Sequence, residues 1–345
     1  MNAQRALLPG NRRHFAHGPI DLVVGADGDA RAVAAAHESA WRRFDKLLAE
    51  LVAELPLLRR PVGGECPLRG PVATRMWHAC LPFRQRFITP MAAVAGSVAE
   101  EIVGFYRGEG IERAWVNNGG DIALHLRPGR SVAIGLFADL ARFEPVVAAS
   151  GQSGERWLAA GRTDGRQRVD GRFEIHHAMP VRGVATSGWR GRSFSLGIAD
   201  SVTVLAATAS QADAAATIVA NAVNIDDPRI RRQPACELKD DTDLGGIPVT
   251  VDVPALDAGS VDRALDAGEG CAQELRAAGL IEAAVLVCQG RARIVGIGLG
   301  ERVGHDARAG LDARAGLGER AGRDERAGRD AARQETDRCR LAFAS

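Results

Sequence analysis

The sequence predicts an α+β fold of mixed helices and antiparallel strands, followed by a disordered tail. Three patterns predict this class: apolar residues recur every three or four positions in some segments, they alternate with polar residues in others, and glycine-containing turns join the alternating segments. Hairpins interspersed with helices favour this class over a doubly wound parallel sheet. The 345 residues divide into a predicted domain at 1–299 and a tail at 300–345.

Four helices are expected. The segment from Ala30 to Leu55 carries an apolar face and stops at Pro56. A second helix is expected to run from Thr89, as N-cap, to Phe105, with Pro90 at its first position. The remaining two are expected at 211–223 and 261–278.

Short strands account for the remaining periodic segments. Strands are expected at 114–116, 122–126, 131–136, 201–206, 283–288 and 291–297. The last two are joined by the two-residue turn Gln289-Gly290, which is typical of a hairpin.

The tail begins near Gly300 and contains a six-residue repeat, of which Asp306-Ala-Arg-Ala-Gly-Leu311 is one copy. A glycine in every unit disfavours a helix, and the few leucines cannot form a core. The pattern predicts a solvated, disordered tail, with an interaction tail as the alternative.

Composition narrows the classes of partner. A net charge of +1 argues against a nucleic-acid-binding protein, and no apolar stretch reaches the length of a membrane span. No secretory signal is recognisable, and the six cysteines show no metal-ligand spacing. We therefore expect reduced thiols, a cytoplasmic protein, no membrane association and a small-molecule partner.

The most informative segment is Ser210-Gln-Ala-Asp213-Ala-Ala-Ala-Thr217, at the start of a predicted helix. Asp213 and Thr217 are four residues apart, so their oxygens project from one helix face, where they could bind Mg²⁺. The alternative is purely structural: Ser210 and Asp213 also form a capping box.

Two glycine-containing segments could contact a ligand. Asn117, Asn118, Gly119, Gly120 and Asp121 lie between two strands and allow close backbone approach, although a simple hairpin turn is the alternative. Thr186, Ser187 and Gly188 belong to the segment from Gly183 to Gly188, which is expected to be a loop that offers hydroxyl groups to phosphate or ribose, or that is only a loop.

Together these segments resemble the ApbE superfamily, and particularly an uncharacterised branch of it. The resemblance rests on Pro90 to Glu100, Val116 to Ile122, Ala185 to Gly188 and Ser201 to Thr217. It implies an ApbE-like fold with FAD as cofactor and Mg²⁺ held by Asp213, Thr217 and the carbonyl of Val94, and a transfer of FMN from FAD to a protein or small-molecule acceptor.

The sequence departs from the superfamily at two places. The histidine and Thr-Gly of its His-x-x-Asp-Pro-x-Thr-Gly segment are missing from the stretch Phe194 to Asp200, and Ala95 stands where the family has a lysine. These losses weaken acid–base and electrostatic help to a transfer step, and they leave the catalytic residue unknown. His176 and His177 are candidate replacements or surface residues. Alternatives are a non-catalytic flavin carrier or sensor, and a structural protein with a vestigial site.

Overall fold

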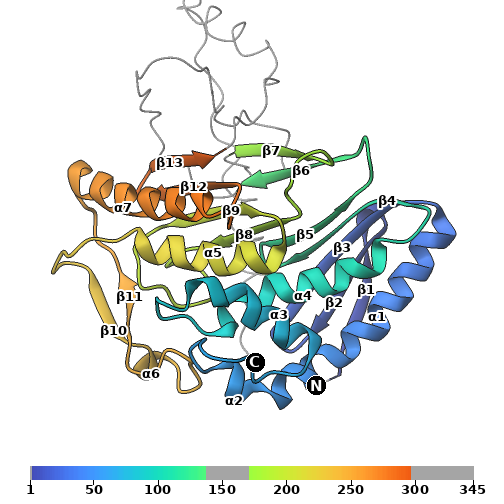
Figure 1. Ribbon diagram of the computed structural model, residues 1–345, viewed down its shortest axis with the longest axis horizontal. Helices are drawn as coiled ribbons and strands as arrows, with labels where there is room; N and C mark the ends of the chain where they lie inside the picture. Colours follow the sequence, from blue (N-terminus) through green and yellow to red (C-terminus); the bar gives the residue numbers. More distant parts are fainter. Residues whose placement is uncertain (1, 137–170, 297–345) are drawn as a thin grey trace, which may run out of the picture. The chain divides into compact units, whose positions relative to one another are not determined.

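A nine-stranded sheet forms the centre of the protein in the computed structural model, which describes residues 2–136 and 171–296. The strand order is β1-β2-β3-β4-β5-β8-β9-β12-β13, and every neighbouring pair is antiparallel (Figure 1). The strands are β1 Gln4–Leu8, β2 Arg12–His17, β3 Ile20–Gly28, β4 Ile111–Asn118, β5 Asp121–Leu126, β8 Gly183–Ser187, β9 Ser201–Ala206, β12 Ala283–Cys288 and β13 Arg291–Gly296.

Two smaller sheets accompany the central one. They pair β6 Ser131–Leu136 with β7 Gly171–His176, and β10 Arg231–Pro234 with β11 Pro248–Asp252. The α+β class is therefore confirmed.

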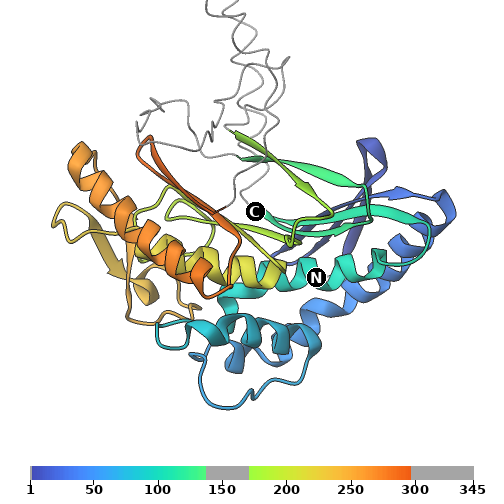
Figure 2. The same ribbon diagram turned by 45° about the horizontal axis from the view of Figure 1, so that its top comes forward.

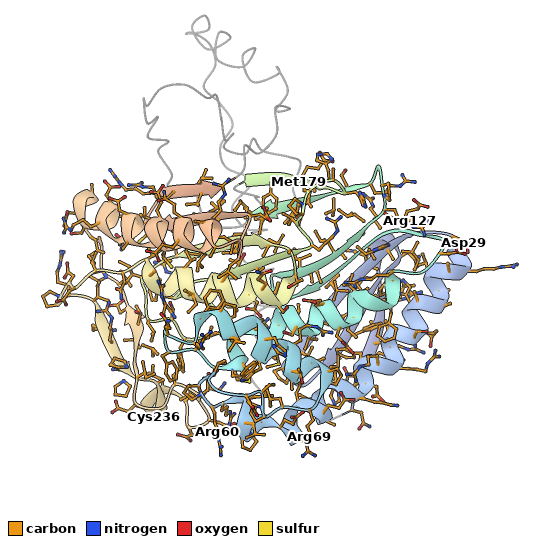
Figure 3. The ribbon with its side chains drawn as sticks, in the orientation of Figure 1. Asp29, Arg60, Arg69, Arg127, Met179 and Cys236 are labelled. Carbon is orange, nitrogen blue, oxygen red and sulfur yellow. The ribbon has the colours of Figure 1, made fainter. Side chains whose placement is uncertain are left out.

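The helices connect these strands. They are α1 Ala30–Ala53, α2 Leu55–Leu58, α3 Pro71–Cys80, α4 Val94–Val103, α5 Ala209–Ala222, α6 Ala235–Leu238 and α7 Ala258–Ala277, with short 3-10 turns η1 Pro9–Asn11, η2 Leu81–Phe83, η3 Pro90–Ala93 and η4 Gly104–Tyr106. Figure 3 shows Asp29 at the start of α1. Its carboxylate accepts the backbone N–H groups of Arg31 and Ala32, which fixes the first turn of this helix.

The two faces of the central sheet bury different clusters. Strand residues such as Val116, Ala123 and Ala185 pack with the helices in the larger core. Residues of opposite parity pack with the β6–β7 hairpin in a smaller cluster that contains Leu124 and Val184. Figure 2 shows the helices along one face and this hairpin on the other. Successive residues of a strand therefore point alternately to the helix layer and to the layer of the β6–β7 hairpin, so a residue's position in the strand tells which layer its side chain enters.

Two sequence predictions need correction. The helix expected from Thr89 to Phe105 is interrupted at Ala93, whose φ of −126° and ψ of 17° separate η3 from α4. The segment expected to be a loop at 183–188 is mostly strand β8, because its residues pair with β9. The other three predicted helices are present; α1 begins at Ala30 as predicted, and the other ends are shifted by one to three residues.

The five cysteines within the described ranges are free, and Cys236 on α6 is exposed (Figure 3). Across those same ranges, no helix combines the length and apolar character needed to cross a membrane. The predicted tail at 300–345 and its repeat lie outside the described residues. A cytoplasmic location stays a prediction.

Candidate functional site

Asp213 lies on the first half of α5 and points toward the beginning of α4. Its Oδ2 accepts the backbone N–H of Gly96 at 2.8 Å. The N-cap of α5 is Thr208, whose hydroxyl accepts the N–H of Gln211. The capping-box interpretation of Ser210 and Asp213 is therefore wrong, and the Asp213 carboxylate instead joins two helices.

The break at Ala93 explains how α4 presents donors to this carboxylate. Because α4 begins at Val94, the first N–H groups of the helix have no partner within it. A carboxylate at this end also interacts favourably with the helix dipole. The close approach depends on Gly96, since a side chain there would overlap the carbonyl oxygen of Ala209.

A second carboxylate reaches the same layer from the β4–β5 hairpin. Asn118 and Asp121 pair across the two-residue turn Gly119-Gly120, whose φ values are 66° and 117°. Both share the strand parity of residues in the helix-side core, and both are buried. Asp121 accepts the backbone N–H of Thr186 at 3.1 Å, and the Asn118 amide donates to the Ala95 carbonyl at 3.2 Å.

Burial raises the pKa of both carboxylates, and the charge of Asp121 acts on Asp213. Burial raises the pKa of Asp121, although the Thr186 N–H and the positive charge of Arg192 oppose this shift. Burial and the neighbouring Asp121 charge raise the pKa of Asp213, while the Gly96 and Ala95 amides oppose the shift. Like charges held in a poorly solvated place disfavour ionisation, and a nearby cation would reverse this effect.

The predicted site residues divide between the two faces of the sheet. Ser187 has the parity of the helix-side residue Ala185, so it faces the layer of Asp213. Asn117 and Thr186 have the opposite parity; Asn117 accepts the Gly120 N–H, and the Thr186 hydroxyl bonds that of Thr203. Only the backbone of Thr186 therefore joins the site.

The other predicted ligands keep their status as predictions. Thr217 follows Asp213 by one turn of α5 and is half-buried. Val94 is the first residue of α4. Gly188 is buried, and a side chain there would overlap the carbonyl oxygen of Asp200.

The oxygen atoms present suit a hard cation that brings its own further ligands. Each carboxylate offers about four lone-pair positions, so Asp121 and Asp213 retain acceptor capacity after their backbone bonds. The Asn118 carbonyl oxygen is available because its amide nitrogen makes the bond to Ala95. Within residues 2–136 and 171–296, no group of three or more His, Cys, Asp or Glu has the geometry of a metal site. The two carboxylates and the Asn118 oxygen would suit Mg²⁺, which is commonly bound by one or two carboxylates together with substrate phosphates and water.

Sequence reasoning missed three residues near these carboxylates. Thr89, expected to cap a helix, instead donates its hydroxyl hydrogen to Asp243. Burial and the charges of Asp213 and Asp243 raise the pKa of the Cys80 thiol, which stays protonated. Arg192 lies beside Asp121. The arginine-rich stretch Arg190-Gly191-Arg192 was the only sequence signal for the last of these.

Comparison with known sequences identifies the family of this chain. The chain is an ApbE-like protein: it belongs to the family described as "AbpE bacteria", which matches residues 5–294. It is similar to the UPF0280 protein MK0206 of Methanopyrus kandleri, with 34% identity over 226 residues that cover 64% of this chain and 78% of the relative. A UPF0280 protein of Methanothermobacter thermautotrophicus is 34% identical over 197 residues, which cover 56% of this chain and 66% of that protein.

Two solved structures are also similar to this chain. The flavinyl transferase ApbE of Pseudomonas stutzeri, in its apo form, has 12% identity and a TM-score of 0.36 over 86% of this chain and 95% of that chain. The ApbE protein of Thermotoga maritima has 14% identity and a TM-score of 0.37 over 85% of this chain and 96% of that chain.

Proposed function

We propose that the protein binds a flavin dinucleotide, FAD, together with Mg²⁺ at the Asp121–Asp213 carboxylate pair. The observation that carries this proposal is the pair itself: two acidic side chains come from distant segments, Asp121 is buried, and the charge of Asp121 raises the cost of ionising Asp213. A divalent cation between them would offset that cost. Membership of the ApbE-like family supports the choice of a flavin ligand.

In this proposal the chain supplies three kinds of group. Asp213, Asp121 and the Asn118 oxygen bind the cation, with Thr217 and the Val94 carbonyl as further candidates. The Gly119-Gly120 turn and Ser187 lie beside the ligand. When bound, Mg²⁺ would neutralise phosphate charge and polarise a phosphoryl oxygen. The alternative of a structural protein with a vestigial site predicts no ligand uptake.

Transfer of FMN to an acceptor is one activity that such a site would support, and flavin carriage without transfer is the other. The position of the histidines favours carriage. His176 ends β7 opposite Ser131 of β6, in the hairpin that covers the sheet face remote from Asp213. Neither it nor the adjacent His177 replaces the missing family histidine. Incubation with FAD, Mg²⁺ and an acceptor protein separates the two, because a covalently bound flavin on the acceptor, formed with release of AMP, would show transfer, whereas AMP with free FMN would show only hydrolysis.

The binding proposal is tested by the melting temperature with FAD, with and without Mg²⁺. At a ligand concentration of about 100 times Kd, we expect a gain of ~2.7 kcal/mol, or about 5 °C for a domain of this size, only when both are present. Asp213→Asn should abolish this gain. Since the amide carries no charge to bury, the same variant should raise the stability of the ligand-free protein by about 1 kcal/mol.

The matched control is Asp266→Asn, which makes the same change at an exposed carboxylate on α7 that pairs with Arg293. It should keep the full ligand effect. An equal stabilisation by FAD in Asp213→Asn, or one that needs no Mg²⁺, would contradict the proposal.

A further inference from the structure

The loop between β8 and β9 carries two arginines with different surroundings. Its base is closed by a hydrogen bond from the backbone N–H of Trp189 to the Ala199 carbonyl at 3.0 Å. The backbone N–H of Gly191 also donates to the Gly188 carbonyl at 3.0 Å. Arg190 and Arg192 flank Gly191, and both are exposed.

Arg190 has partners within its own loop. Its guanidinium lies 4.9 Å from the ring centre of Trp189, and its Nε is 3.7 Å from the Asp200 carboxylate. These contacts account for its position without any ligand.

Arg192 reaches out of the loop to the β4–β5 turn. A side chain at position 119 would overlap its Nη2 atom, so the guanidinium lies directly against the backbone of Gly119. Within the described ranges, its guanidinium makes no hydrogen bond and no ion pair. Among the described residues, none therefore uses its five N–H donors, although its positive charge lowers the pKa of Asp121.

The combination resembles the two sides of a phosphate site. Two carboxylates alone repel an anion, and a bound divalent cation would only balance their charge. The Arg192 guanidinium at the same turn adds the further positive charge, and its planar donors suit phosphate oxygens. The Gly119-Gly120 turn allows close approach because neither residue has a side chain.

We propose that Arg192 binds the phosphate groups of the ligand held at the Asp121–Asp213 pair, so that the diphosphate is recognised by this arginine and the carboxylate-bound cation together. This inference rests on the proposed function. It assigns to the chain a second cationic element beside the carboxylate-bound cation.

The test is calorimetric titration of the full chain with FAD and with riboflavin, both in the presence of Mg²⁺. Arg192→Ala should weaken FAD binding about tenfold, as expected for the loss of a charge-assisted hydrogen bond at a partly solvated site, and it should leave riboflavin binding unchanged. Arg190→Ala is the matched control, because it removes the same charge from the same loop and should bind FAD like the wild type. Arg192→Lys should lie between the two.

Three results would overturn the inference. Equal FAD affinity in the Arg192 and Arg190 variants would show that Arg192 does not bind phosphate. Equal losses for FAD and riboflavin would place Arg192 at the ring or in folding. Tighter binding of Mg²⁺ alone by Arg192→Ala, with an unchanged FAD-to-riboflavin ratio, would make Arg192 only a counter-charge to Asp121. Wild-type protein that takes up no FAD with Mg²⁺ would instead refute the proposed function itself.

Discussion

His37 is a buried imidazole on α1 whose Nδ1 lies 2.7 Å from the hydroxyl oxygen of Tyr106. Burial, and secondarily the positive charge of Arg13, lower the pKa of His37 from 6.5 to about 4, although Glu38 opposes the shift. Burial likewise raises the pKa of Tyr106. Both groups are therefore neutral in the folded protein at neutral pH.

This pair predicts a pH dependence of folding. Between pH 6.5 and about 4, the unfolded chain protonates His37 while the folded chain does not, so stability falls as the pH is lowered through this window. Well above pH 6.5, His37 is neutral in both states and does not contribute to the dependence of stability on pH. The total loss is at most about 3 kcal/mol.

The variant that checks this is His37→Asn, which keeps a polar partner for Tyr106 and does not titrate. We expect it to reduce the slope of unfolding free energy against pH in that window, as measured by denaturant melts. His14→Asn is the control, since His14 is exposed enough to pair with Asp21 at the surface. A slope unchanged in His37→Asn would refute the assignment.

For single residues, the sequence indicated which side chains could bind a ligand better than it indicated their hydrogen-bond partners. The spacing of Asp213 and Thr217 indicated one helix face, and that face is present. The hydrogen-bond partner of Asp213 is Gly96, 117 positions away, and no local pattern indicates such a contact. The rejection of the capping box therefore required the tertiary structure, and the role of Asp213 as a metal ligand stays a prediction.

The contact between α4 and α5 is the element on which the site depends. It is close because Gly96 has no β-carbon: one placed there would lie 2.2 Å from the Ala209 carbonyl oxygen and 2.9 Å from the Asp213 Cβ. The backbone atom cannot give way without moving a helix.

Gly96→Ala should therefore lower the free energy of unfolding by about 1–3 kcal/mol and weaken Mg²⁺-dependent FAD binding, because it separates the two helices. The control is Gly104→Ala, just beyond the same helix, where nothing lies within 4 Å of an added β-carbon and the backbone is helical. That change should be neutral or stabilising by up to ~1 kcal/mol. Denaturant melts and FAD titrations distinguish the two variants; equal behaviour would argue against the contact.

Element prediction succeeded where periodicity was long and failed where it was short. Helices α1, α5 and α7 each span fourteen or more residues, and their apolar spacing located them. The interruption at Ala93 occurs within a continuous apolar pattern, so spacing alone could not reveal it. Strand β8 was taken for a loop because its five residues include Gly183, Thr186 and Ser187, and its strand character comes from pairing with β9.

One of the two buried clusters of the domain lies on the sheet face away from the candidate site. The smaller core beneath the β6–β7 hairpin contains Phe173 and Leu124 on the sheet face opposite the helices, whereas Asp121 and Asp213 lie in the helix layer. A change in that core should therefore weaken folding without changing ligand affinity.

Phe173→Ala is expected to lower the free energy of unfolding by about 3–4 kcal/mol, because the Phe173 side chain is buried and its removal leaves a cavity. The FAD affinity measured with Mg²⁺ at a temperature where the variant is folded should equal that of the wild type. Phe173→Leu should cost less. A large loss of affinity in Phe173→Ala would mean that the two faces are coupled.

At the scale of the molecule, the class of fold and the family could be predicted from sequence, but the order of strands in the sheet could not. The pairing of β5 with β8 and of β9 with β12 joins segments separated by many residues. The alternation within β4 and β5 is local, and it places Asn118 and Asp121 on the helix side of the sheet and Asn117 on the other side.

The same strand order has a consequence during synthesis. The segments that carry Gly96, Asp121 and Asp213 leave the ribosome well before β12, the strand that pairs with β9. Until Cys288 has emerged, β9 has an unpaired edge, and the helix that follows it rests on an incomplete sheet. Under the proposed function, we therefore expect FAD to be captured at these carboxylates only late in translation, and a stalled nascent chain that ends before residue 283 should not retain it.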